Sequence, residues 1–202
     1  MRRVHVLTHP EVEIDPAVPV PDWRLSPLGL ARARAMLGAP WVAGIGAVFS
    51  SAERKARDMA EILGAHLGLT PEVEPALGEN DRSATGYLLR AEFERTADAF
   101  FAHPETSIRG WERAVDAQAR IVAAVARLLA QAAPEGDIAI VAHGGVGALL
   151  LCHLTGAPIS RAADQPGEGG GNRFVFTLPG WRLASGWMPI DPPAAGATEE
   201  TA

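Results

Sequence analysis

The sequence predicts an α/β fold in which helices cover both faces of a largely parallel sheet. Short strand-like segments alternate with helix-like segments along the chain, and the segment 138–142 has no polar face. Such alternation is typical of βαβ units, and a strand without a polar face is covered on both sides. We therefore expect one domain over residues 1–191, built as a three-layer α/β/α sandwich, followed by a disordered tail at 192–202.

Six segments have the composition and alternation of strands. They cover residues 4–7, 47–51, 72–77, 138–142, 173–178 and 182–188. The first runs into Thr8-His9-Pro10, where proline ends strand pairing because it has no N–H group. The last two segments are close enough in the chain to pair with each other.

Five segments have helical spacing of apolar residues. They begin near residues 27, 52, 87, 111 and 144. Ser26 and Pro27 form an N-cap and first-residue pair for the first of these helices. Its expected apolar face consists of Leu28, Leu30, Ala31, Ala35 and Leu37. The second helix ends at Gly68 and buries Ala56, Met59, Ala60, Leu63 and Leu67. Residues 80–112 form an insertion able to act as a helical cap, and Gly167 to Gly171 is interpreted as a linker.

Composition excludes several classes of protein. The net charge is −6 over 202 residues, and the arginines are scattered, so we expect no nucleic-acid surface. The single Cys152 excludes an intramolecular disulfide and is interpreted as a buried packing residue. No apolar run has the length of a membrane span or a signal sequence, so we expect a cytoplasmic protein without a membrane partner. The oligomeric state stays open.

Two histidines follow strands at positions where α/β proteins place their functional groups. His9 comes after the first strand, and His143 comes after the most apolar one, immediately before Gly144 and Gly145. The start of a helix favours an anion because its first N–H groups are unpaired. Two histidines facing each other across a phosphate-sized pocket indicate phosphoryl chemistry. The acids at Glu11, Glu13 and Asp15 lack the spacing of a metal site, so no metal is expected.

Four motifs follow one another in order along the chain. They are Leu7-Thr8-His9-Pro10, the run Ser50-Ser51-Ala52-Glu53-Arg54-Lys55-Ala56, Leu77-Gly78-Glu79, and His143-Gly144-Gly145. Together they resemble the histidine phosphatase (phosphoglycerate mutase-like) superfamily over about residues 3 to 178.

This resemblance implies roles for individual residues. His9 is the implied nucleophile that carries a transient phosphohistidine, and His143 stabilises the phosphoryl group. Glu79 is the implied general acid, with Asp81 two residues further on as the alternative. Gly144 is expected to contribute to substrate binding at the helix start, and no cofactor is implied.

Two positions differ from the pattern of this superfamily, which has arginine at both. Thr8 and Lys55 stand where those arginines hold the phosphoryl oxygens, and both are expected to contact substrate. Lys55 borders the buried stripe of its helix. In contrast, Arg54 has Asp58, and Arg57 has Glu53 and Glu61, four residues away, as surface pairs do. If another arginine enters the site, the candidates are Arg3, Arg82, Arg109 and Arg173.

The leading hypothesis is a metal-independent phosphatase that acts on a small phosphomonoester or a phosphoprotein. Two alternatives remain. One is a catalytically weak or inactive anion-binding protein, for which Thr8 and Lys55 are the argument. The other is a mutase-type phosphotransferase, which needs a lid that protects the intermediate from water.

Overall fold

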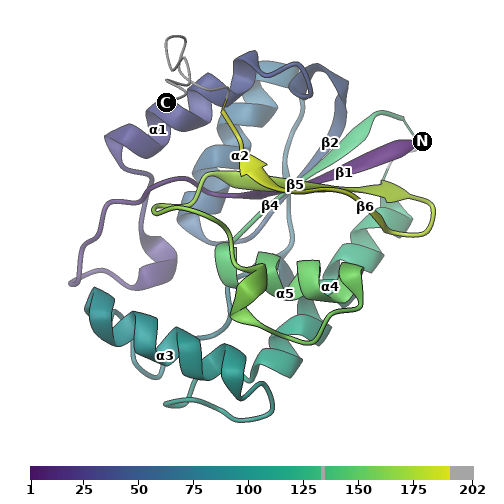
Figure 1. Ribbon diagram of the computed structural model, residues 1–202. Coiled ribbons are helices and arrows are strands. Elements are labelled where there is room, and N and C mark those ends of the chain that lie inside the picture. Colours follow the sequence, from purple (N-terminus) through teal and green to yellow (C-terminus); the bar gives the residue numbers. More distant parts are fainter. Residues whose placement is uncertain (133–134, 192–202) are drawn as a thin grey trace, which may run out of the picture.

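A computed structural model of the chain describes residues 1–132 and 135–191, and the expected tail at 192–202 lies outside the described residues (Figure 1). Its centre is a six-stranded sheet with the strand order β3-β2-β4-β1-β5-β6. The strands are β1 (Arg2–Thr8), β2 (Ile45–Ser50), β3 (Glu72–Val73), β4 (Asp137–Ala142), β5 (Asn172–Leu178) and β6 (Arg182–Pro189). β1 to β4 pair in parallel, whereas β5 is antiparallel to both β1 and β6.

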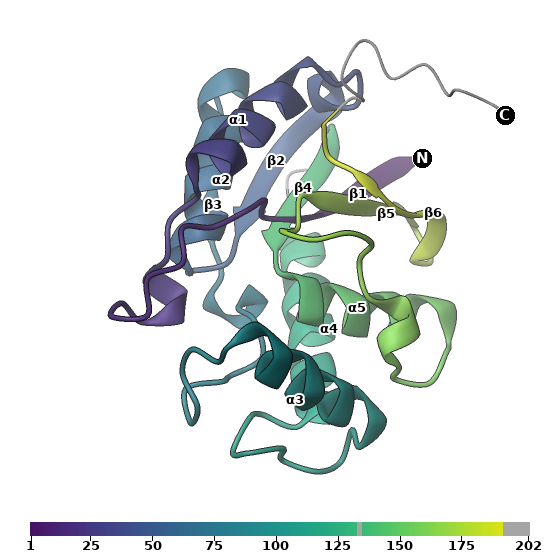
Figure 2. The same ribbon diagram turned by 60° about the vertical axis from the view of Figure 1, so that its left-hand side comes forward.

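Helices cover both faces of this sheet, as the sequence predicts. They are α1 (Pro27–Ala35), α2 (Arg54–Leu67), α3 (Arg90–Ala102), α4 (Ala114–Gln131) and α5 (Gly144–Thr155). In Figure 2, α1 and α2 lie on one side of the sheet, and α4 and α5 lie on the other. Alternate residues of β4 enter the two cores. Ile138 and Ile140 face α4 and α5, whereas Ala139 and Val141 face α1 and α2.

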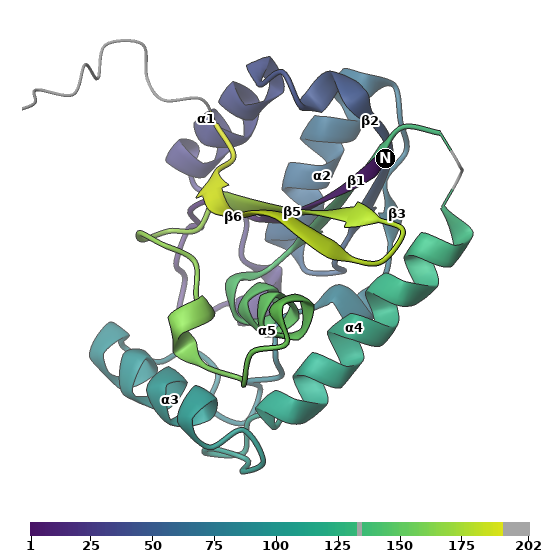
Figure 3. The ribbon, with the colours of Figure 1, turned by 45° about the vertical axis from the view of Figure 1, so that its right-hand side comes forward.

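α3 makes a further layer beyond the helices that cover the sheet. Its Phe100 and Phe101 pack with Trp111, and with Ala148 and Leu149 of α5. Figures 1 to 3 all show α3 beyond α5, on the side away from the strands. The segment 80–112 therefore forms a helical layer that rests on α4 and α5.

Most expected elements are confirmed, with the prediction for the apolar face of α1 being wrong. Ser26 caps this helix by accepting the Gly29 N–H at 3.0 Å, as predicted. However, α1 buries Gly29 and Ala33, while Leu28 is 55% exposed. The small face is buried because the chain at Glu11 crosses it closely: a Cβ on Gly29 would lie 2.1 Å from the Glu11 carbonyl oxygen.

The third strand is shorter than predicted. β3 ends at Val73, and residues Pro75–Leu77 form a 3-10 turn instead of continuing the strand. Pro75 cannot donate to the sheet, and the Glu74 side chain accepts the Ala76 N–H at 2.9 Å, which starts the turn. Cys152 is buried and free, as expected.

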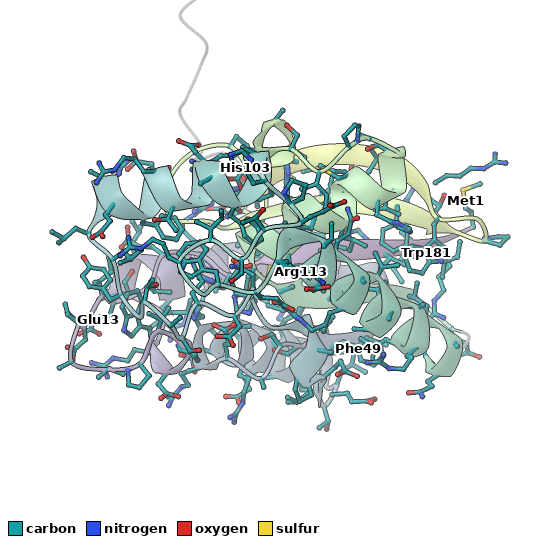
Figure 4. The ribbon with its side chains drawn as sticks, turned by 90° about the horizontal axis from the view of Figure 1, so that it is seen from below. Met1, Glu13, Phe49, His103, Arg113 and Trp181 are labelled. Atoms are coloured by element: carbon teal, nitrogen blue, oxygen red, sulfur yellow. The ribbon has the colours of Figure 1, made fainter. Side chains whose placement is uncertain are left out.

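The strand register places the ends of three neighbouring strands side by side. Thr8 pairs with Ala142, and Ser50 pairs with Val141. His9, Ser51 and His143, the residues that follow these strands, therefore leave the sheet at the same edge. Figure 4 shows Glu13, in the loop after β1, at the opposite end of the molecule from Met1 and Trp181, so this edge lies at the Glu13 end.

Candidate active site

His9 lies at the edge of the sheet in a position suited to a nucleophile. Its Nδ1 is 2.9 Å from the Pro10 carbonyl oxygen. Because a carbonyl can only accept, Nδ1 carries the proton and the Nε2 lone pair stays free. Burial, together with the neighbouring His143 and Lys55, lowers the pKa of His9 to about 3. The ring is therefore neutral near pH 7.

His143 faces His9 and is almost completely buried. The two ring centroids are 5.2 Å apart, with their planes at 67°. The Nε2 atom of His143 lies 2.8 Å from Ser51 Oγ and 3.4 Å from Glu53 Oε1, while its buried Nδ1 has no hydrogen-bond partner among the described residues. Burial lowers the pKa of His143, against the opposing effect of the carboxylates of Glu53 and Glu79. A neutral imidazole follows.

Glu79 lies beside the start of α5, where its carboxylate accepts hydrogen bonds from N–H groups of the first turn of the helix. Its Oε2 accepts the Gly145 N–H at 3.0 Å, and its Oε1 accepts the Val146 N–H at 2.9 Å. Glu79 lines the same cavity as His9, which Asp81 does not. The Asp81 carboxylate instead accepts the N–H of Ser83 at 2.8 Å at the surface. Of the two acids left open by the sequence, Glu79 is the one beside the histidines.

Lys55 is buried at the site but is already neutralised by a carboxylate. Its Nζ donates to Glu53 Oε2 at 2.5 Å and to the Val20 carbonyl oxygen at 2.9 Å. The lysine side chain is 4% exposed, so this pairing takes place almost out of water. An anion that enters the site must compete with Glu53 for this cation.

Glu53 is a site residue that sequence reasoning missed, and its interpretation as a surface partner of Arg57 was wrong. Glu53 is the N-cap of α2, so its side chain lies at the start of the helix and turns inward. Its Oε1 also accepts the Glu79 N–H at 2.8 Å. Burial raises the pKa of Glu53, but His143, Lys55 and these hydrogen bonds outweigh burial and bring it to about 2. The carboxylate is therefore ionised.

Thr8 is buried directly before His9, and its hydroxyl is engaged within the protein. Thr8 Oγ1 donates to Gln165 Oε1 at 2.6 Å and accepts the Asn172 N–H at 2.9 Å. Thr8 is not among the residues that line the cavity with His9, and the sequence pattern contains no sign of its partner Gln165, which is 157 residues away in the chain.

Among the four candidate arginines, Arg82 is the one that lines the cavity with His9. Its guanidinium carbon lies 5.2 Å from the ring centroid of Phe93 and 5.7 Å from that of Trp111. In the part of the chain that the structure describes, Arg82 has no carboxylate within ion-pair distance. Arg109 pairs with Glu92. Arg173 lies outside this cavity, with its guanidinium carbon 4.7 Å from the ring centroid of Trp41.

The cavity beside the histidines has a volume of about 510 Å³ and continues into a second one of about 750 Å³. Gly144, Gly145 and Gln165 line the first cavity together with His9 and Glu79. Residues 168–170 of the loop interpreted as a linker also border this cavity. Gly170 packs against His9, where a Cβ would lie 2.3 Å from the His9 carbonyl oxygen.

Neither a metal-binding cluster nor a membrane-spanning helix is found in the part of the chain that the structure describes. Within residues 1–132 and 135–191, no group of three or more His, Cys, Asp or Glu side chains is arranged to hold a metal ion. In the same ranges, no helix combines the length and apolar character needed to cross a membrane.

Known proteins resemble this chain in sequence pattern and in fold. A sequence model of the histidine phosphatase superfamily (branch 1) matches residues 9–184. None of the proteins with curated descriptions matches the sequence. A mycobacterial glucosyl-3-phosphoglycerate phosphatase solved with inorganic phosphate is 27% identical, with a TM-score of 0.76 over 94% of this chain and 99% of that chain.

Two structures with lower sequence identity share the fold. Bacillus stearothermophilus YhfR is 19% identical, with a TM-score of 0.77 over 92% of this chain and 95% of that chain. A putative alpha-ribazole-5′-P phosphatase from Escherichia coli is 17% identical, with a TM-score of 0.73 over 95% of this chain and 98% of that chain.

Proposed function

This chain belongs to the histidine phosphatase superfamily (branch 1), and from that membership and the site geometry we propose that it is a metal-independent phosphatase. It hydrolyses a phosphomonoester through a phosphohistidine on His9. The observation that carries this proposal is the free Nε2 of a neutral His9, which faces His143 and shares a cavity with Glu79.

In the proposed first step, the Nε2 lone pair of His9 attacks phosphorus and the bond to the leaving oxygen breaks. Glu79, which is displaced from the α5 N–H groups and takes up a proton as the substrate enters, gives that proton to the leaving oxygen. In the second step, the Glu79 carboxylate takes a proton from water as the water oxygen attacks phosphorus. The P–N bond then breaks, which releases phosphate and restores the His9 lone pair.

The surroundings supply donors for the phosphoryl oxygens. The N–H groups at the start of α5, next to Gly144, are directed at the site, and Glu79 occupies two of them in the free protein. An incoming phosphoryl group competes for these donors and displaces the carboxylate toward the leaving oxygen. Arg82 lines the cavity as a cation without a carboxylate partner among the described residues.

The substrate is a small phosphorylated molecule or a phosphoprotein whose leaving group occupies the adjoining cavity of about 750 Å³. Trp23, Tyr87 and Phe93 line that cavity together with Arg82. The phosphatase relatives named above act on small phosphorylated molecules, by their names. This supports a small organic phosphate in preference to a phosphoprotein.

A second candidate function is a catalytically weak or inactive anion-binding protein. One observation favours it: Glu53 already neutralises Lys55, and Thr8 has no charge to offer. Such a protein keeps the fold and binds a phosphorylated ligand without turnover.

One experiment separates the two candidates. Hydrolysis of 4-nitrophenyl phosphate is measured with EDTA present for the wild type, His9→Ala and the control His103→Ala, whose histidine lies at the end of α3. We expect EDTA-resistant activity that His9→Ala abolishes and His103→Ala keeps. Folded wild-type protein without activity supports the anion-binding protein, and equal activity in His9→Ala rules out His9 as the nucleophile.

A further inference from the structure

We propose that Gln165 is a substrate-binding residue for the phosphoryl group, and that Thr8 acts as the positioning residue that orients it. This inference rests on the proposed phosphoryl site, but not on turnover. It assigns a neutral amide donor to the side of the site where position 8 has no arginine.

The hydrogen bonds of Gln165 determine which end of its amide faces the cavity. Oε1 accepts from Thr8 Oγ1 at 2.6 Å and from Asn172 Nδ2 at 3.2 Å. Thr8 Oγ1 accepts the backbone N–H of Asn172, and its own proton has two acceptors within reach, Gln165 Oε1 at 2.6 Å and the Asn172 carbonyl oxygen at 3.2 Å, of which Gln165 is the nearer. A flipped amide would place one NH2 group against another at Asn172. The oxygen therefore faces Thr8.

The nitrogen end of the amide is directed toward the start of α5. A Cβ on Gly144 would lie 2.4 Å from Gln165 Nε2, so the absence of a side chain at Gly144 makes room for this amide. Gln165 lines the cavity that also contains His9 and Glu79. Across the described residues, Nε2 donates no hydrogen bond within the protein. Its two N–H groups are thus available to a ligand beside His9.

Thr8 contributes through Gln165, because its own hydroxyl is buried. The Thr8 side chain is 1% exposed and has both hydrogen-bonding roles filled, by Gln165 and Asn172. A longer side chain at position 8 would meet Gln165 first. In this chain, Thr8 and Gln165 together therefore stand in place of the arginine guanidinium that the superfamily has at position 8.

A neutral donor changes which anions the site prefers. An amide forms a weaker hydrogen bond to a phosphoryl oxygen than a guanidinium does, and its attraction depends less on the charge of the anion. Lys55 is neutralised by Glu53 at the same site. We therefore infer a phosphoryl site held mainly by neutral donors, in which much of the affinity for substrate comes from the leaving group.

The test measures binding of orthovanadate and of inorganic phosphate by calorimetry, so it does not depend on hydrolysis. Gln165→Leu keeps the size of the side chain and removes its donors, and we expect about tenfold weaker binding of both anions. Gln165→Glu is expected to weaken binding further, because a carboxylate repels the anion. Gln131→Leu, at the exposed end of α4, is the matched control and keeps wild-type affinity.

Thr8 variants test the positioning role. Thr8→Val removes the hydroxyl with little change of shape and is expected to weaken anion binding severalfold in the wild type but not in Gln165→Leu. Thr8→Ser restores the hydroxyl and keeps wild-type affinity. A purely structural Thr8 would give the same loss in both backgrounds.

Several outcomes overturn the proposal. Binding within twofold of wild type in both Gln165→Leu and Gln165→Glu removes Gln165 from the site. Equal losses for Thr8→Val in the two backgrounds remove the positioning role. Melting temperatures show whether any variant unfolds. In that case, the difference in anion affinity between Thr8→Val and Thr8→Ser decides whether the hydroxyl positions Gln165. Failure of the phosphatase proposal is recognised separately, as folded wild type that binds vanadate but does not hydrolyse ester.

Discussion

Arg82 is the residue whose position bears most directly on how the proposed phosphoryl site would hold its ligand. It lines the cavity beside His9 and lies near the rings of Phe93 and Trp111, which limit its freedom. A guanidinium held in place before the ligand arrives loses little rotamer entropy on binding. With Lys55 neutralised and position 8 uncharged, Arg82 is the cation best placed to assist phosphoryl binding.

Replacing Arg82 tests this role directly. We expect Arg82→Gln to lower kcat/KM for an aryl phosphate by about ten- to a hundredfold, because a charge-assisted hydrogen bond contributes about 1.5 to 3 kcal/mol. Arg95→Gln, on the exposed side of α3, is the control and is expected to keep the wild-type value. A variant at position 82 with unchanged kcat/KM would exclude Arg82 from substrate binding.

Glu53 has the opposite effect to Arg82, because it opposes the binding of an anion. Its carboxylate holds Lys55 and lies 3.4 Å from His143 Nε2, so it competes with any anion for the same groups. We expect Glu53→Gln to bind inorganic phosphate several times more tightly, because Lys55 then keeps only the Val20 carbonyl oxygen as a partner. Calorimetry measures the affinity, with the exposed Glu61→Gln on α2 as control. Weaker binding in Glu53→Gln would instead assign the carboxylate to orienting Lys55.

At the scale of the elements, α1 positions the loop that follows His9. The loop crosses α1 at Glu11, whose backbone accepts the Ser26 N–H at 3.0 Å and whose carbonyl oxygen lies over Gly29. The Glu11 side chain also accepts from Ser26 Oγ at 2.8 Å. The start of one helix therefore holds the segment directly after His9, the proposed nucleophile.

A pair of glycine substitutions tests this contact. Gly29→Ala places a Cβ 2.1 Å from the Glu11 carbonyl oxygen, so either the loop or the helix must shift. We expect a loss of about 2 kcal/mol or more in the free energy of unfolding, together with reduced activity. Gly38→Ala, with no atom within 4 Å of its Cβ, is the control. Urea unfolding measures both, and equal stability of the two variants would contradict the tight crossing.

At the scale of the whole molecule, the site lies between the carboxyl ends of the strands and the layer formed by α3. The carboxyl ends of β1, β2 and β4 supply His9, Ser51 and His143, whereas the layer formed by α3 supplies one wall of the cavity through Phe93 and Phe100. α3 rests on α4 and α5 through its own apolar cluster. The cavity therefore depends on packing between layers as well as on the sheet.

Buried neutral histidines link the stability of the whole molecule to pH. His5 of β1 is 2% exposed, and burial together with the charge of Arg173 lowers its pKa to about 4. The unfolded chain, with a histidine pKa near 6.5, binds this proton more readily than the folded one. Stability from this residue is therefore complete above pH 6.5 and is lost as the pH falls toward 4.

Unfolding at two pH values checks this sign. Between pH 7.5 and pH 5, we expect the free energy of unfolding to fall by about 2 kcal/mol for His5 alone, with His9 and His143 adding to the loss. His5→Phe keeps the stacking on Trp41 and should reduce the loss by that amount. His66→Gln, at the exposed end of α2, is the control. A loss in His5→Phe as large as in wild type would contradict the assignment.

Local patterns in the sequence determined the order and kind of the elements and the position of the two histidines. Period-two and helical spacing report which side of an element is buried, so the apolar segment 138–142 identifies the central strand β4. Ser26, Pro27 and Gly68 mark helix ends because capping depends on residues next to one another. The motifs around His9, Glu79 and His143 were readable for the same reason, since each is short and follows an element.

The tertiary structure decided the contacts between residues that are far apart in the chain. Thr8 and Gln165 are separated by 157 residues, and the inward turn of Glu53 depends on the distant His143 and Glu79. Spacing within each helix assigned Glu53, at the start of α2, to the surface and Leu28, in α1, to the core. Both assignments were wrong, because a neighbouring segment determines which face of a helix is covered. Periodicity contains no information about that neighbour. The donors that face the cavity, Arg82 and Gln165 among them, are determined by how the layers pack.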